Sequence, residues 1–177
     1  MSDWYDKLIS LLGLDPIRRD VLFGTPLHSF PEWTFRRSAG TARPSLCQLP
    51  DGRTQLVFEL RCVDTPWVGF IPASARNLTA VEDFLGQVDA ATVAERGTQW
   101  PRKVVMAPLP DRNLDSVVEL AWDASHAGGA RLEFTIRGPR GYLRQELDWT
   151  PALAADWKEL LAQARARSTP WPSGGKN

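Results

Sequence analysis

The chain has 177 residues, of which 43% are hydrophobic and 24% charged, values typical of one globular domain with a sizeable core. Its 21 basic and 21 acidic side chains balance to a formal net charge of zero, which argues against a general attraction to nucleic acid or to an anionic membrane surface. No stretch approaches the roughly 18 apolar residues of a transmembrane helix, and the N-terminus lacks the pattern of a signal peptide. Arginine far outnumbers lysine, a bias typical of GC-rich bacterial genomes. We therefore expect a cytoplasmic bacterial protein.

The first predicted element is an amphipathic helix over residues 3–12. Tyr5, Leu8, Ile9 and Leu12 recur at the spacing of one helical face. A helix of about ten residues is only marginally stable by itself, so this one is expected to dock on another surface.

Short strands follow. The stretch 21–31 mixes aromatic residues with glycine and prolines and supports no assignment, and residues 38–44 are predicted to form a loop. Period-two alternation and turn residues predict strands at 33–37, 46–49, 54–63 and 67–71.

A second helix is predicted over residues 79–96. Thr79 and Glu82 have the spacing of a capping box, in which two side chains satisfy free amides at the helix start. Val81, Phe84 and Val88 lie on its predicted buried face.

A strand is predicted at 103–106. Residues 117–149 then alternate apolar and polar side chains through three segments, which predicts an antiparallel meander with charged residues on its outer face. Thr150 as N-cap and Pro151 in the first turn then begin a helix over 151–167.

These elements predict an α+β fold with a mostly antiparallel sheet, curled or in two layers, of about six to eight strands covered by three helices. We expect a single domain over residues 1–168 and a flexible tail at 169–177. Within the domain, 32–97 and 102–167 each resemble a β-meander closed by a helix, which raises the hypothesis of an internal duplication.

The sequence contains no catalytic signature. It lacks the nucleophile motif GxSxG, a glycine-rich phosphate loop and the CxxC, HxxxH or HExxH spacings of metal sites. We therefore expect no enzyme, no cofactor and no metal. Cys47 and Cys62 are expected to be reduced thiols, with a disulfide between them as the less favoured alternative.

Two groups of residues are candidates for binding. Eight tryptophans are more than an average core requires, and tryptophan is enriched where proteins bind each other. The second group surrounds a predicted hairpin turn, where arginines flank a tyrosine that could stack on a base. The candidates are Trp4, Trp33, Trp67 and Trp100, and Arg137, Arg140, Tyr142 and Arg144.

The leading hypothesis is a non-enzymatic protein-binding module, such as a bacterial immunity protein or a secretion adaptor or chaperone. Its partner is expected to be another protein rather than a membrane or a nucleic acid, and homo-oligomerisation is possible. One alternative is a small-ligand domain with an aromatic-lined pocket, expected around Trp67 or Trp100. A hydrolase using dispersed carboxylates is the least favoured reading.

Overall fold

The computed structural model describes residues 23–36, 38–62, 66–93, 102–106, 117–123, 131–138 and 141–168. The predicted helix at 3–12 and the tail at 169–177 lie outside these ranges. Within them the chain forms two antiparallel sheets and two helices, so the predicted α+β class is confirmed. The described residues form nine strands, slightly more than expected, and they divide between two sheets.

The first sheet is built from the N-terminal half. Its strand order is β1-β3-β4-β5, with the two-residue strand β2 pairing with β3 beside β1. Its strands are β1 (Thr25–Ser29), β2 (Trp33–Thr34), β3 (Thr41–Gln48), β4 (Thr54–Arg61) and β5 (Pro66–Pro72).

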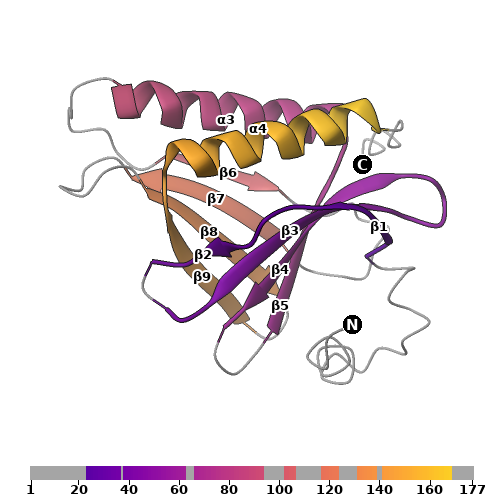
Figure 1. Cartoon of the computed structure of the whole chain (residues 1–177), viewed down its shortest axis with the longest axis horizontal. Coiled ribbons are helices and arrows are strands. Elements are labelled where there is room, and N and C mark those ends of the chain that lie inside the picture. The colour runs from indigo at the N-terminus through magenta and orange to yellow at the C-terminus, as the bar shows by residue number, and fades with distance from the viewer. Residues whose placement is uncertain are drawn as a thin grey trace, which may run out of the picture.

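The second sheet is a meander of neighbouring strands, as predicted for the C-terminal half. It consists of β6 (Arg102–Met106), β7 (Val117–Asp123), β8 (Arg131–Gly138) and β9 (Gly141–Asp148). Helix α3 (Ala75–Val93) joins the two sheets, and α4 (Pro151–Ala166) follows the second. Figure 1 shows the helices side by side along one side of the molecule, with the strands beneath them.

Each helix contacts strands of the sheet that the other half of the chain forms. Helix α3 follows the first sheet but contacts β6 of the second, whereas α4 follows the second sheet but contacts β3 and β4 of the first. The two helices also contact each other and run in opposite directions (Figure 1). Each half of the chain therefore supplies a helix to the core of the other half.

Aromatic rings join the layers of this shared core. Trp157 of α4 lies 5.1 Å from the ring of Trp33 and 5.6 Å from that of Phe58, both in the first sheet. Phe58 in turn lies 4.9 Å from Phe134 of the second sheet. All four side chains are buried. One continuous apolar core therefore includes both sheets and both helices.

The two sheets come into close contact at Gly69 of β5, which has no side chain. A Cβ atom built on Gly69 would lie 2.7 Å from Cδ1 of Ile136 and 2.9 Å from Cγ2 of Val118. The glycine thus gives two side chains of the second sheet direct access to the backbone of the first.

The predicted loop at 38–44 is wrong in its second part, because β3 already begins at Thr41. Pro44 lies inside this strand, opposite Phe58 of β4. Its carbonyl accepts a hydrogen bond of 3.0 Å from the amide of Phe30, so its missing N–H faces the gap between β1 and β2. A proline fits a strand where no neighbouring strand needs its amide.

The predicted start of the middle helix is also wrong. Helix α3 begins at Ala75, and the hydroxyl of Ser74 accepts a hydrogen bond of 3.2 Å from the amide of Asn77. Thr79 and Glu82 lie in the second turn, where the amides are already paired within the helix, so they cannot form a capping box. The predicted residues 94–96 of this helix lie outside the described ranges.

The last helix agrees with its sequence signals. Thr150 is the N-cap, and its hydroxyl accepts a hydrogen bond of 3.1 Å from the amide of Leu153, with Pro151 in the first turn. Cys47 and Cys62 are not joined in a disulfide; Cys47 is buried and Cys62 half-buried.

Candidate functional site

A groove of about 410 Å³ lies between α3 and α4. Gly86 of α3 and Ala162 of α4 are both exposed, and a Cβ atom built on Gly86 would meet no described atom within 4 Å beyond its own helix. Side chains this small leave the two helices apart at the surface. The apolar and small residues that line the groove are Leu85, Gly86, Trp149, Ala154, Leu161 and Ala162.

Trp149 lies directly before the cap of α4. Strand β9 ends at Asp148, and Trp149 is half-buried. It packs against the core and also lines the groove. A large ring that is partly accessible in an apolar hollow offers area for a second molecule at a low cost in conformational entropy.

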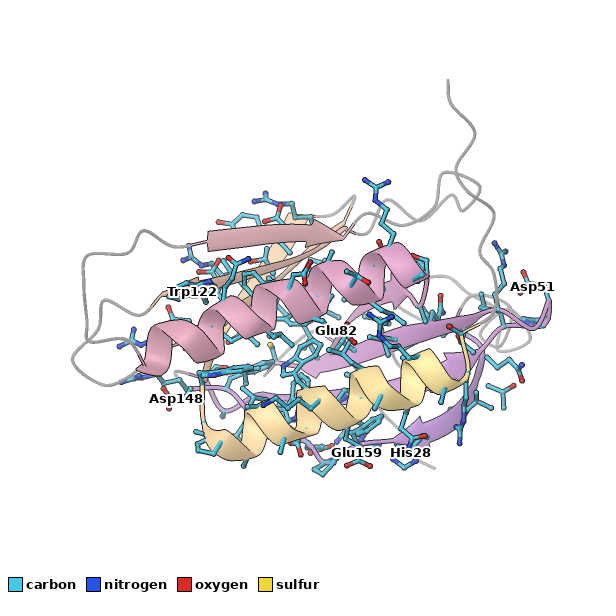
Figure 2. All side chains as sticks on the ribbon, turned by 90° about the horizontal axis from the view of Figure 1, so that it is seen from above. His28, Asp51, Glu82, Trp122, Asp148 and Glu159 are labelled. Atoms are coloured by element: carbon cyan, nitrogen blue, oxygen red, sulfur yellow. The ribbon has the colours of Figure 1, made fainter. Side chains whose placement is uncertain are left out.

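An ion pair between the helices lies in the lining of the groove. Arg165 of α4 donates from Nε to Oε1 of Glu82 at 2.7 Å and from Nη2 to Oε2, and the same Nη2 also donates to the hydroxyl of Thr79 at 3.1 Å. The hydrogen bond from Arg165 lowers the pKa of Glu82, and burial opposes it in part. Figure 2 shows Glu82 on α3 where the two helices face each other. Lys158 adds a further positive charge to the lining.

Among the predicted tryptophans, Trp33 and Trp67 fall within the described residues. Trp33 is 5% exposed, and its indole N–H donates to Oδ2 of Asp156 on α4 at 3.1 Å, so this side chain ties the first sheet to α4. Trp67 is half-buried against the core. Neither of them lines the groove. Trp4 and Trp100 lie outside the described residues.

The predicted hairpin cluster lies on the outer face of the second sheet. Tyr142 is 65% exposed, and the guanidinium of Arg137 lies 5.6 Å from the centre of its ring. Arg137 also donates to Glu119 at 2.9 Å, and Arg144 pairs with Glu133.

These contacts continue along the sheet, where Arg131 pairs with Glu146 at 3.4 Å. The result is a row of ion pairs between neighbouring strands, as expected from the charge pattern. Arginines already paired with carboxylates attract phosphates weakly, and Arg140 lies outside the described residues. Within the described part of the chain, the structure therefore does not join the hairpin cluster and the tryptophans into one site.

Among the described residues, no three His, Cys, Asp or Glu side chains gather where they could hold a metal ion. His28 of β1 approaches Glu159 of α4 at 4.0 Å, and both side chains are substantially exposed at the outer edge of α4 (Figure 2). No helix in the described part of the chain is long and apolar enough to cross a membrane.

Comparisons with known proteins add little to this picture. No family model matches the chain, and no curated protein matches it. Among solved structures, the plant transcriptional regulator PBF-2 is similar over 78% of this chain and 85% of its own, with 11% identity and a TM-score of 0.35. A similarity this low carries no argument about fold or function.

Proposed function

We propose that this protein is a protein-binding module and that the groove between α3 and α4 receives an apolar segment of its partner. The supporting observation is an open, largely apolar hollow between two helices that are held together at the Arg165–Glu82 pair. Apolar grooves between helices commonly bind the apolar face of an amphipathic helix, whose side chains recur every three or four residues.

The chemistry of the lining limits what the partner presents. Leu85, Leu161 and Trp149 offer apolar area, so the partner needs apolar anchors at the centre of its face. Glu82 and Arg165 neutralise each other in the same lining, so the apolar anchors are the feature of the partner that this groove selects. We propose that the protein binds such a segment as an immunity protein that blocks a toxin, or as a secretion adaptor or chaperone.

The test uses the tagged protein as bait in lysate of its source cells, followed by titration with the purified partner. Gly86→Phe fills the groove and should weaken binding at least about tenfold, a difference of roughly 1.4 kcal/mol. Gly86→Ala is the matched control, because it adds a single methyl group in open space and also favours the helix.

Tyr142→Ala probes the hairpin cluster in the same assay. If binding survives Gly86→Phe but is lost with Tyr142→Ala, the groove is not the binding site and the hairpin takes its place.

A small-ligand domain is the second candidate, and one observation favours it. The groove volume of about 410 Å³ lies within the roughly 300–1,000 Å³ of small-molecule sites, and Trp149 supplies an aromatic wall. Trp67, around which the sequence predicted such a pocket, does not line this groove, and Trp100 lies outside the described residues. A metabolite that raises the unfolding temperature of the wild type, but not that of Gly86→Phe, would establish this reading.

The hydrolase alternative requires two carboxylates in unequal environments facing one cleft. Among the described residues, Glu82 is the single carboxylate that lines this groove, and its ion pair with Arg165 favours the charged form. Nothing in the geometry of the groove supports that reaction.

A further inference from the structure

The first sheet has an apolar cluster on the face turned away from the helices. Strand geometry sends neighbouring side chains to opposite faces, so Val57 points away from the side on which Phe58 meets Trp157 of α4. Phe70 of β5 and Cys47 of β3 lie on the same outer face as Val57. With Phe23 they form a cluster separate from the main core.

This cluster on the outer face is buried although neither α3 nor α4 lies on it. Val57 is 2% exposed and Phe70 1%, whereas Tyr142 on the outer face of the second sheet is 65% exposed. Of the described members of the cluster, Phe23 is the one that does not belong to β3, β4 or β5. One phenylalanine is too small to remove several side chains on three strands from water.

We propose that residues 3–12 form an amphipathic helix whose apolar face, Tyr5, Leu8, Ile9 and Leu12, covers this outer face of the first sheet. The chain leaves the cluster at Phe23, whose carbonyl accepts a hydrogen bond of 3.0 Å from the side chain of the buried Gln55, so residues 1–22 begin where cover is needed.

The dimensions agree with this placement. A ten-residue helix is about 15 Å long, at 1.5 Å per residue. Three strands about 4.8 Å apart span roughly 10 Å between the outer two. Residues 13–22 can extend to about 33 Å, ample length to return from the far end of such a helix to Phe23. The first sheet then has helices on both faces, and this expectation is independent of any partner in the groove.

Disulfide trapping tests the placement in the full chain. In a Cys62→Ser background, Cys47 is the remaining native thiol on the outer face. Leu8→Cys, Ile9→Cys and Leu12→Cys put a thiol on the apolar face of the predicted helix, while Lys7→Cys and Ser10→Cys put one on its polar face. After mild oxidation with diamide and digestion, mass spectrometry should find a link within one chain from Cys47 to at least one of the three apolar positions.

The polar positions should give no such link, because a disulfide requires Cα atoms within about 7 Å. Equal linking from both faces, or no linking, overturns the proposal. Links between two chains show instead that a second copy covers the face, which also overturns it.

The reactivity of Cys47 is an independent measurement. In the same Cys62→Ser background, the double variant Leu8→Asp/Ile9→Asp should detach the helix and raise the rate at which iodoacetamide alkylates Cys47 by about tenfold or more, because local opening controls the access of reagent to a buried thiol. Ser10→Asp, which adds the same charge on the polar face, should leave the rate unchanged. An unchanged rate in the double variant, with circular dichroism showing an intact fold, overturns the proposal as well.

Discussion

Arg165 in the last turn of α4 holds the carboxylate of Glu82 on α3, with 2.7 Å between its Nε and Oε1 of Glu82. The two residues are 83 positions apart in the chain and lie on antiparallel helices that each contact a different sheet. The pair therefore joins the two halves of the molecule at the surface, beside the groove that we propose as the binding site.

This pair makes a small, pH-dependent contribution to stability. Because Arg165 lowers the pKa of Glu82 in the folded protein, the contribution is present above the pKa of an unfolded glutamate, roughly 4.3, and is lost as the pH falls through the lower folded value. Glu82→Gln should slightly lower the unfolding temperature at pH 7, and the difference from wild type should disappear in acid.

Both side chains of the pair are more than a third exposed, so the effect at pH 7 is expected to be modest. Thermal unfolding followed by circular dichroism across the pH range measures it. Arg165→Gln should remove the same pH dependence, and a Glu82→Gln effect that persists at low pH would contradict the assignment.

The two halves of the chain should not fold separately. Trp157 of the second half fills the core beside Trp33 and Phe58 of the first, and α3 of the first half contacts β6 of the second. Fragments ending at 97 and beginning at 102 are each expected to lack a cooperative unfolding transition, and mixing them should restore one. A sharp transition in either fragment alone would show two independent domains.

Phe134 is a test of the core between the sheets. It is 1% exposed and its ring lies 4.9 Å from that of Phe58. Phe134→Ala should cost about 3–5 kcal/mol of unfolding free energy, because a cavity remains where the ring was. Tyr142→Ala on the exposed face of the same sheet should change stability by less than about 0.5 kcal/mol. Chemical denaturation measures both, and similar costs would show that the faces have been assigned incorrectly.

Gly69 tests the close approach of the sheets. The methyl group of Gly69→Ala would lie 2.7 Å from Cδ1 of Ile136, so the side chains of the second sheet must move and stability should fall by about 1–3 kcal/mol. Ile136→Val removes that Cδ1 atom, and the double variant should recover part of the loss. Chemical denaturation measures the unfolding free energy of each variant. If the loss in the double variant equals the sum of the losses in the two single variants, the two residues do not touch.

Local patterns in the sequence predicted much of the fold. The alternation through 117–149 predicted the meander of the second sheet, and Thr150 followed by Pro151 predicted the start of α4, because strand period and helix capping depend on neighbouring residues. Pro44 was misleading, since whether a strand tolerates proline depends on the neighbour that its amide would face.

The candidate site shows the limit of such patterns more clearly. Of the eight residues proposed from the sequence, the five that the structure describes do not line the groove, whereas Gly86, Trp149 and Ala162, which do, were not proposed. A glycine and an alanine on the polar faces of helices have no local signal for binding, although they mark positions where a second helix could leave a gap.

By itself, then, the sequence determined which residues alternate into strands, where α4 begins and which side chains are apolar enough to be buried. The tertiary structure alone decided that each helix packs on the other half's sheet, that Glu82 meets Arg165 instead of capping its own helix, and that two small residues open a groove. The reason is physical: secondary structure follows from contacts a few residues apart, whereas the pairing of surfaces depends on how distant segments share one core.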